Sequence, residues 1–561
     1  MPSRVPILRN QLTFLPDLLE EKVEQGPHAA RFYLYLADIL NLNLKKVSPL
    51  GAPPYCRHTA LASIFYAMHH GHFESEQIVK FIGDSIGAHW ILSGMTIPSY
   101  KTIERVVNDL LGEVENLFIQ ILNLCDGFDL IGRERTFVDG TKKQANASKH
   151  KAMSYEYLNK KIDSGAEALK VLFKELRSIM DGIEDLTDDE FDSLVLRDAK
   201  ITRTELRRSH KQDLTERQEQ IFNIDIESEE SVKKDRAIEK LKNELESMST
   251  IEPENQDKAL EMLNDTAFIS NRVDRMIDAK DLLETKWKEK HGDKKISDKC
   301  QINFTDPDSA IMQTKHHGIQ QCYNHFAIVD AKANIILGSY TSSSSSDQLG
   351  LIPVIKNVGR IFGSLEGIIL VGDAGFFSAA NILYCLENGI DFYASYPEAK
   401  SPYAKDKFEY DRQKDVYICP KGSVLSVERQ SKDLEKSKYS NEDACRSCSH
   451  SKDCTKAKDG IRRIERHMVD DMLREDAKEK AQSETGKEVL KQRKSVPEPV
   501  FGNMKTQDKF TQMHFRGTDK VSAEFDLHCV FQNIRKLYKV YMNSSSFQET
   551  VHRSENYQAL A

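Results

Sequence analysis

Short apolar runs that lead into an aspartate predict the buried strands of a sheet. Residues 368–371 are all apolar and the chain turns at Asp373 shortly afterwards, while an apolar pair leads into Asp139 in the same way. Residues 326–337 contain two apolar stretches around a polar turn, which predicts an antiparallel pair of strands. Residues 390–394 predict one more strand, after a helix that ends at a glycine.

Apolar residues spaced three or four positions apart predict helices around these strands. Strands that first pair antiparallel and later alternate with helices predict a mixed sheet covered on both faces, which is an α/β fold. Residues 155–295 are rich in charge, poor in glycine and apolar at helical spacing, so they predict an insertion of long, paired polar helices. The other predicted helices are 29–42, 59–68, 75–82, 100–110, 351–361 and 381–388.

The predicted helices before residue 111 are short and compact. The last of them follows Ser99, a good helix cap, and carries Lys101 and Arg105. Helices of this size suit a helix-turn-helix unit that reads the major groove of DNA. Three packed helices with a purely structural role have the same pattern, so both interpretations stand.

The length, net charge and composition of the sequence limit the class of protein. At 561 residues the chain can bury several cores, and three or four structural units are expected. A formal net charge of −8 is not that of a uniformly basic nucleic-acid binder, so DNA contacts must come from local basic patches. The chain has no apolar run long enough to span a membrane and no signal-peptide pattern, which predicts a soluble, cytoplasmic protein with no membrane partner. Its ten cysteines are too sparse for a disulfide scaffold.

Three acids have contexts that suit a divalent cation. A lone carboxylate at the end of a buried strand is costly unless a partner neutralises it, and Asp139 and Asp373 share this context. Glu498 lies between two prolines, which are tolerated in the first turn of a helix, and Lys505 follows on the same side two turns later. Hard carboxylate oxygens suit Mg²⁺ or Mn²⁺ in phosphoryl transfer. The alternative is structural, because aspartate turns and exposed helical glutamates are common.

Four cysteines between residues 419 and 454 can form a structural zinc site. A single cysteine is followed by a Cys-x-x-Cys pair and a fourth cysteine, which can give tetrahedral coordination in a small loop-rich module. The spacing from the first cysteine to the pair is long, so four reduced thiols are the alternative. The residues are Cys419, Cys445, Cys448 and Cys454.

Several short motifs occur in one order along the chain, and that order resembles the DDE transposases of bacterial insertion sequences. The resemblance covers roughly residues 50–540. In that family two aspartates and a glutamate bind the catalytic metals on a ribonuclease-H-like fold, and by position these would be Asp139, Asp373 and Glu498. The motifs lie at residues 137–142, 305–309, 323–330, 372–376, 497–505 and 514–517.

The resemblance also implies partners and a cellular setting. It implies Mg²⁺ or Mn²⁺ as cofactor and double-stranded DNA as partner, both as transposon ends and as target. The N-terminal helices would recognise the terminal inverted repeats, and a homodimer would join two ends on the DNA. A similar cysteine cluster occurs in many members of the family. The bacterial protein would be cytoplasmic and associated with the nucleoid when bound to DNA.

Polar and basic residues around the three acids, together with two basic residues of the last N-terminal helix, are candidates for contacts with DNA. The chain departs from the family upstream of the glutamate, where many related transposases have a tyrosine and an arginine and this chain has Lys491, Arg493 and Lys494. Solvated lysines are the simple alternative for several of these positions. The candidates are Lys101, Arg105, Lys142, Asn146, Arg493, Lys494, Lys505 and Arg516.

The expected units follow from these assignments. An all-α DNA-binding domain precedes a ribonuclease-H-like catalytic core that two insertions interrupt, one charged and helical and one small and cysteine-rich. The expected bounds are 1–130 for the helical domain, 131–154 and 296–396 for the first parts of the core, 155–295 for the helical insertion, 397–490 for the cysteine-rich insertion, 491–545 for the glutamate helix and basic part, and 546–561 for a flexible tail.

Three functions agree with the sequence. The first is a DDE transposase that cleaves DNA at its own inverted repeats and transfers the freed strand to a target. The second is a metal-dependent nuclease of the same fold that cleaves without joining strands. The third is a DNA-binding protein in which the acids are remnants of the fold, and the intact acids and Lys505 count against it.

Overall fold

A computed structural model of the chain describes Val23 and residues 28–43, 56–93, 95–180, 253–314, 318–431 and 435–558. The middle of the expected helical insertion, residues 181–252, lies outside the described residues. The chain divides into two compact units. Unit 1 comprises Met1–Lys143, Asn324–Thr511 and Asp519–Ala561, and unit 2 comprises Gln144–Tyr323 and Gln512–Thr518.

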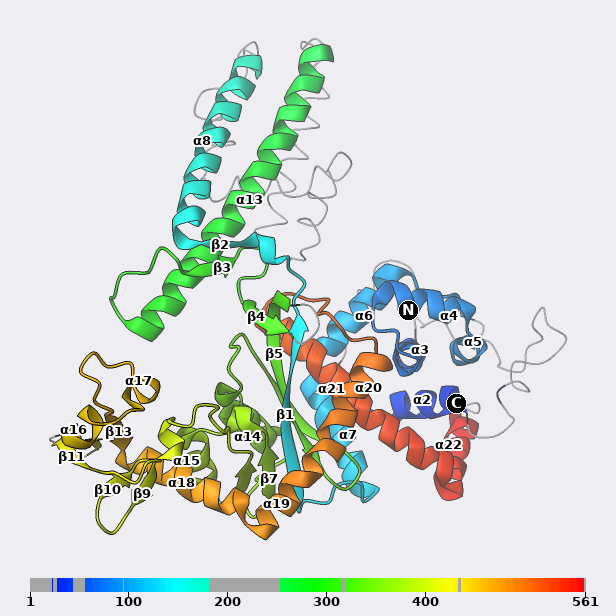
Figure 1. Ribbon diagram of the computed structural model, residues 1–561. Helices are drawn as coiled ribbons and strands as arrows, with labels where there is room; N and C mark the ends of the chain where they lie inside the picture. Colours follow the sequence, from blue (N-terminus) through cyan, green and yellow to red (C-terminus); the bar gives the residue numbers. More distant parts are fainter. Residues whose placement is uncertain are drawn as a thin grey trace. The chain divides into compact units, whose positions relative to one another are not determined.

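A mixed sheet forms the centre of unit 1 (Figure 1). In it, β1 (Arg135–Gln144) separates β5 (Gly318–Asp330) and β6 (Ile336–Ser342) from β7 (Ile369–Gly372) and β8 (Asp391–Ala394). The β5–β6 hairpin is antiparallel, whereas β1 runs parallel to β7 and β7 runs parallel to β8. These pairings confirm the predicted mixed sheet, its antiparallel hairpin and the strand before Asp373.

Helices cover both faces of this sheet. Gly338 of β6 lies against α14 (Leu351–Ile361), where an added Cβ atom would come within 2.8 Å of a valine methyl group. The next residue, Ser339, donates a hydrogen bond to Asp526 of α21 (Thr518–Asn543). Because adjacent side chains of a strand point to opposite faces, α14 and α21 lie on opposite sides of the sheet. The predicted cover of both faces is therefore confirmed.

The described residues before the sheet are helical and belong to unit 1. The bounds are α2 (Ala29–Ile39), α3 (Arg57–His69), α4 (Ser75–Asp84), α5 (Ile86–Leu92), α6 (Tyr100–Gly112) and α7 (Val114–Gly127). The ring centroid of Phe32 on α2 lies 5.5 Å from that of Tyr541 on α21, and Phe65 on α3 lies 5.4 Å from Phe531 on α21. Aromatic packing thus joins these helices to one that also covers the sheet. The four helices predicted in this region are α2, α3, α4 and α6.

The segment expected to be a flexible tail, 546–561, instead provides most of α22 (Ser545–Gln558). Phe547 and Val551 of this helix are buried, and the ring of Phe547 stacks on that of Phe128 at 4.6 Å. Two apolar residues four positions apart lie on one face of a helix. They anchor a segment whose other residues are mostly polar, which is why its composition indicated a tail.

The expected cysteine-rich insertion contains a second, antiparallel sheet of unit 1. Its core consists of the buried side chains of Phe408, Tyr417, Leu425, Tyr439 and Ile464. The strands pair in the order β13, β12, β11, β10 and β9. Along the chain, α15 precedes this sheet, α16 and α17 lie between β12 and β13, and α18 to α20 follow it. Their bounds are β9 (Glu409–Asp411), β10 (Val416–Ile418), β11 (Val424–Gln430), β12 (Lys436–Ser440), β13 (Ile464–His467), α15 (Ala379–Glu387), α16 (Glu442–Arg446), α17 (Ser451–Cys454), α18 (Met468–Gln482), α19 (Glu484–Lys491) and α20 (Pro497–Thr506).

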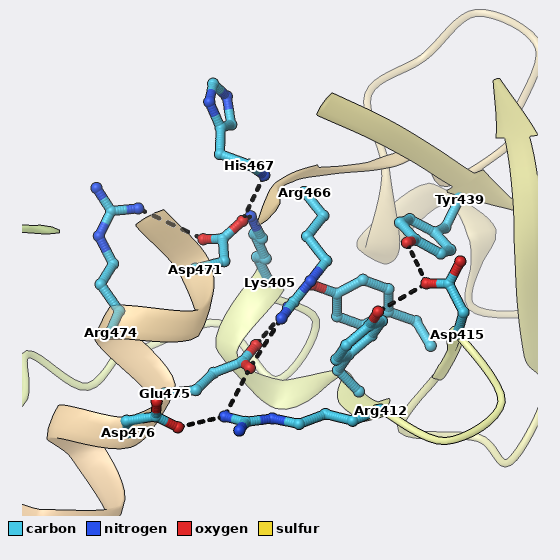
Figure 2. Close-up of polar contacts among 12 residues, drawn as sticks. Lys405, Arg412, Asp415, Tyr439, Arg466, His467, Asp471, Arg474, Glu475 and Asp476 are labelled. Carbon is cyan, nitrogen blue, oxygen red and sulfur yellow. Dashed lines mark hydrogen bonds and ion pairs between the residues drawn. The ribbon is translucent and has the colours of Figure 1, made fainter. Parts of the chain in front are cut away.

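Ion pairs and hydrogen bonds between charged side chains connect this second sheet to α18 (Figure 2). Arg466 of β13 has a side chain that is only 3% exposed, and it donates hydrogen bonds of 2.5 and 3.0 Å to the two oxygens of Glu475. Its guanidinium also stacks 3.6 Å from the ring centroid of Tyr410. Arg412, whose side chain is half-exposed, donates a hydrogen bond of 2.5 Å to Asp476 on the same helix. A buried, bidentate and stacked arginine therefore holds the sheet to the helix.

Replacing Arg466 with alanine should lower the free energy of unfolding by about 3 kcal/mol, because Glu475 would lose its buried partner. Urea denaturation of the full chain measures this change. The matched control is Arg412→Ala, which removes a half-exposed arginine from the same acidic pair and should cost less than about 1 kcal/mol. Equal losses for the two variants would contradict the role given to Arg466.

Two long helices dominate unit 2 and lie side by side (Figure 1). They are α8 (Tyr155–Met180) and α13 (Pro253–His291). Leu158 of α8 shares an apolar cluster with Met276 of α13 and with Phe304. The described ends of the expected helical insertion are thus paired, as predicted. No helix in the described ranges is both long and apolar enough to cross a membrane.

Buried polar contacts organise the rest of unit 2. Asp306 is fully buried and accepts hydrogen bonds from the Tyr323 hydroxyl at 2.7 Å and from the Gly517 backbone N–H at 3.2 Å. These bonds hold residues 512–518 against the strands of the unit. The strands are β2 (Ala152–Ser154), β3 (Gln301–Asn303), β4 (Ala310–Thr314) and the first part of β5, with which β4 pairs antiparallel.

Candidate functional site

Asp139 and Asp373 lie at the same edge of the central sheet. Their strands, β1 and β7, are parallel neighbours, and Phe137 stands opposite Val371. Two positions further along each strand, the same register brings Asp139 beside Asp373. The residues directly before the acids are buried, so the sheet fixes both backbones and presents the acids where the parallel pairing ends.

The guanidinium of Arg493 lies between the two carboxylates. One of its terminal nitrogens is 3.8 Å from Oδ1 of Asp139 and 4.0 Å from Oδ2 of Asp373. Arg493 belongs to the short helix η5 (Gln492–Ser495), in which the Gln492 side chain accepts a hydrogen bond of 2.5 Å from Arg135 of β1. The sequence indicated Arg493 as a DNA contact but did not place it with the aspartates, because no local pattern links such distant residues.

Backbone N–H groups orient both carboxylates. The N–H of Gly140 donates to Oδ1 of Asp139 at 2.9 Å, and the N–H of Gly375 donates to Oδ1 of Asp373 at 2.8 Å. Asp373 thereby caps the short helix η3 (Ala374–Phe376) and keeps its other oxygen towards Arg493. The turn after Asp373 thus has a defined structural role in addition to carrying the acid.

Two polar residues that adjoin this pair were not among the candidate site residues, although one of them, Asn324, lies in the motif at residues 323–330. Asn324 of β5 donates a hydrogen bond of 2.8 Å to Asp347, at the start of the short helix η2 (Asp347–Leu349). A Cβ atom added to Gly375 would lie 2.9 Å from a carboxylate oxygen of both Asp347 and Asp373. The only sequence signal for Asp347 is an acid just before a predicted helix, and acids are common there as caps.

Glu498 lies in the first turn of α20, where the two prolines predicted the start of a helix. Val500, Phe501 and Met504 bury the other side of α20, while Glu498 and Lys505 are exposed. Within the described part of the chain, Glu498 makes no hydrogen bond or ion pair. The structure therefore brings the two aspartates together, and among the described residues they form no group of three acids with the glutamate, which lies on a helix that follows Arg493 directly.

Lys143 is a buried cation on the same strand as Asp139. Its side chain is 2% exposed, its ammonium donates to the carbonyl of Phe510, and it lies 4.4 Å from the centroid of that ring. Burial and, to a smaller extent, the positive charge of Lys505 together lower the pKa of Lys143 to about 7.

Lys143→Met should change how stability depends on pH. In the unfolded chain Lys143 has its ordinary pKa of 10.5, whereas folding lowers it to about 7. Between these values the unfolded state binds more protons, so the wild-type protein gains stability as pH rises, and the variant lacks this gain. The difference between their free energies of unfolding should change by up to about 4 kcal/mol over that range. Chemical denaturation at several pH values measures it.

The control for this prediction is Lys142→Met, on the same strand but only half-buried. It should leave the dependence of stability on pH parallel to that of the wild type. If Lys143→Met and the wild type also gave parallel curves, the buried ammonium would not be the titrating group.

The other candidates for DNA contacts lie in different parts of the chain. Lys101 and Arg105 are exposed on α6, whose cap Ser99 accepts a hydrogen bond of 3.3 Å from a backbone N–H as predicted. In unit 2, the Asn146 backbone carbonyl accepts a hydrogen bond of 2.6 Å from Arg516, so these two residues hold each other. The side chain of Lys494 lies outside the described residues.

The four predicted zinc ligands line one cavity of about 50 Å³ at the edge of the second sheet. Cys454 is partly buried, and burial raises its pKa, with the nearby Arg462 acting in the opposite direction. All four cysteines are free thiols. Soft sulfur donors facing one small cavity fit the chemistry of Zn²⁺. The ligands are Cys419, Cys445, Cys448 and Cys454.

In the described ranges no group of three or more histidine, cysteine, aspartate or glutamate side chains has the arrangement of a finished metal site. The two aspartates nevertheless offer hard oxygen donors on adjacent strands, which is the donor type that Mg²⁺ and Mn²⁺ prefer. The residues present at the strand ends therefore fit a divalent cation by their chemistry.

Comparison with known proteins gives one match. Residues 418–538 match the family model described as the transposase DDE domain. The matched segment begins beside Cys419, includes Glu498 and Lys505, and ends within α21. No curated protein and no solved structure matched the chain. The family match confirms the resemblance to DDE transposases that the order of motifs indicated.

Proposed function

We propose that this protein is a DDE transposase that binds the terminal inverted repeats of its insertion sequence, cleaves them and transfers the freed strand to target DNA. The observation that carries the proposal is the side-by-side placement of Asp139 and Asp373 at the ends of parallel strands. The family match supports it independently, because the matched residues contain Glu498 and contain neither aspartate. Two separate features therefore favour one activity.

The arrangement of the central sheet supports a ribonuclease-H-like core. Such a core has an antiparallel hairpin beside the first strand and parallel strands on its other side, as the resemblance implies. The order β6, β5, β1, β7, β8 has this arrangement, with the first acid on β1 and the second directly after β7. The glutamate comes from a later helix, α20.

Asp139, Asp373 and Glu498 would hold the catalytic cations, which are Mg²⁺ or Mn²⁺. Such cations activate an attacking hydroxyl group and stabilise the departing 3′ oxygen of a phosphodiester. The protein positions these acids: the backbone N–H groups of Gly140 and Gly375 orient the two aspartates, and α20 carries the glutamate. Binding in this site requires Glu498 to approach the pair of aspartates.

Cationic side chains would bind the phosphate groups of DNA beside these acids. Lys505 is exposed on the same helix as Glu498, and Arg493 already lies at the aspartates. Lys142, Asn146, Lys494 and Arg516 are further candidates, and Lys101 and Arg105 on α6 would contact the terminal repeats. A homodimer would hold two transposon ends together, and the bacterial protein would work in the cytoplasm, on the nucleoid.

The function is tested by cleavage of a DNA duplex that carries the flanking repeats of the element, with Mg²⁺ present. Asp139→Asn, Asp373→Asn and Glu498→Gln should each lower the cleavage rate by at least about a thousandfold, because each removes an acid from the proposed metal site. The control Glu387→Gln changes an exposed acid of α15 and should cleave like the wild type.

The same assay separates the alternative functions. Cleavage followed by joining to a target duplex supports transposition, and cleavage without joining would indicate a nuclease. Specific binding of the repeats without cleavage by the wild type would instead favour a non-catalytic DNA-binding protein. Wild-type cleavage by Asp373→Asn would overturn the assignment of the acids.

We also propose that Cys419, Cys445, Cys448 and Cys454 bind one structural Zn²⁺. The four thiols line a single cavity beside the core of the second sheet, where an ion would connect the β10–β11 turn to the segment after β12. A tetrahedral sulfur site would add stability to a small sheet with a small apolar core.

Elemental analysis of the purified protein should find about one zinc per chain, as expected for one tetrahedral site. Cys448→Ser should lose most of this zinc and lower the melting temperature. Cys300→Ser, which changes a cysteine of unit 2, should retain the zinc. Equal zinc content in Cys448→Ser and the wild type would exclude this site.

A further inference from the structure

Two open hollows adjoin each other along α21, one of the helices that cover the central sheet. Their volumes are about 580 and 530 Å³, and Lys536 and Lys539 line both of them. The first hollow also has walls from the ends of α3 and α20, and the second from the turn between β5 and β6. Among the described residues, no aspartate or glutamate lines either hollow. The two hollows therefore present cations and neutral polar groups to solvent.

Arg535 fixes the walls of the first hollow. Its guanidinium pairs with the buried carboxylate of Asp508 at 2.5 Å and donates a hydrogen bond of 3.1 Å to the backbone carbonyl of Met68, near the end of α3. Asp508 follows α20 and also accepts a hydrogen bond of 3.0 Å from Gln532 of α21. These contacts connect all three helices around the hollow. The positive charge of Arg535 is balanced by Asp508, so this residue holds the walls together.

Lys536 and Lys539 have no comparable partner. They are three positions apart on α21 and so lie on the same face of the helix. Neither makes an ion pair within the described ranges. Partial burial and, to a smaller extent, the positive charge of Lys539 lower the pKa of Lys536. Two like charges on one helix face repel each other, and an anion bound between them would remove this repulsion.

Neutral donors complete the chemistry of a site for phosphate groups. Asn503 and Gln507 of α20 line the first hollow, opposite the lysines of α21. Neither side-chain amide makes a hydrogen bond in the part of the chain that the structure describes. Amide and ammonium groups are both common ligands of the phosphate oxygens of DNA. The first hollow therefore offers donors of both kinds from two helices.

The length of this surface suits a chain of phosphates better than a single phosphate. The lining residues of α21 begin at Gln532 and end at Asn543, and a helix of that length spans about 16 Å. Duplex DNA carries one negative charge for about every 1.7 Å of its axis, so several phosphates would face the surface. Because Lys536 and Lys539 line both hollows, they can contact neighbouring phosphates of one strand.

The first hollow lies close to the proposed catalytic glutamate along α20. Glu498 and Asn503 are five residues apart on this helix, which corresponds to about 8 Å along its axis. Lys505, already a candidate for phosphate contacts, lies between the two lining positions Asn503 and Gln507. DNA held in the hollow would consequently pass beside the helix that carries Glu498.

We propose that the two hollows along α21 form one groove that binds the sugar-phosphate backbone of duplex DNA. Lys536 and Lys539 bind the phosphates, and Asn503 and Gln507 donate hydrogen bonds to them. This inference rests on the proposed function and extends it to two lysines that lie outside every motif of the sequence. Backbone contacts carry no sequence information, so the groove strengthens the binding of any duplex alike.

The test measures binding of labelled DNA duplexes to the full-length protein by fluorescence anisotropy at several salt concentrations, without a divalent cation. One duplex carries the terminal repeat of the element and the other an unrelated sequence. The double variant Lys536→Gln with Lys539→Gln should bind both at least about tenfold more weakly. The slope of log Kd against log salt concentration should fall by about 2, because each lost phosphate contact removes about 0.9. Lys520→Gln, which changes an exposed lysine of α21 outside both hollows, should bind like the wild type.

Gln507→Glu tests the wall that α20 contributes and removes no cation. A carboxylate in the first hollow would repel phosphates, so binding of both duplexes should weaken about threefold, the size of an exposed charge interaction. Gln482→Glu adds the same charge at an exposed position outside the hollows and should bind like the wild type. Circular dichroism checks that each variant folds, and Lys539→Gln alone, at an exposed position, should lower the salt slope by about 1.

The outcomes separate the groove from the proposed function. Unchanged affinity and salt slope in the double variant, with DNA still bound and cleaved by the wild type, would overturn the groove and leave the proposed function standing. A loss confined to the terminal-repeat duplex would contradict binding through the backbone. Tighter binding of an RNA duplex than of the DNA duplex would overturn the assignment to DNA. A wild-type protein that binds no duplex would overturn both proposals.

Discussion

The parallel pairing of β1 with β7 is the constraint on which the rest of the site depends. The two strands come from distant parts of the sequence, and their backbone hydrogen bonds set Phe137 opposite Val371. With that register, Asp139 and Asp373 leave the sheet side by side. A slip by one residue would turn one of the acids to the other face of the sheet. The buried apolar residues of both strands resist such a slip, so the core determines the separation of the two acids.

Charged groups near this edge are placed by connections within the fold. Gln492 ties η5 to the start of β1, which brings Arg493 to the aspartates. Asn324 and Asn381 connect the loop at η2 to the sheet and to the turn after Asp373. Each connection uses a polar side chain that crosses between elements, and the one made by Asn324 also orients the carboxylate of Asp347. The site is therefore a meeting point of five chain segments and has no single organising loop.

The second sheet depends on a different kind of contact. Its apolar core is small, so the stacked and doubly hydrogen-bonded Arg466 contributes much of its attachment to α18 (Figure 2). A buried arginine needs partners for its charge: Glu475 and the Tyr417 hydroxyl accept hydrogen bonds from its terminal nitrogens, and the ring of Tyr410 stacks on it. The four cysteines line a cavity beside the same core, where a bound ion would stabilise a region that has only a small apolar core.

The sequence by itself determined the strands of the central sheet that surround the two aspartates and about half of the described helices, because apolar periodicity and turn residues are local properties, but it did not indicate the strands of the second sheet. It also predicted the start of α20 from two prolines, the cap at Ser99 and the resemblance to DDE transposases that the family match confirmed. Only the tertiary structure decided that Arg493 and Asp347 adjoin the aspartates and that residues 546–558 form a packed helix. Those results depend on contacts between distant segments, and no pattern along the chain records which distant residues will meet.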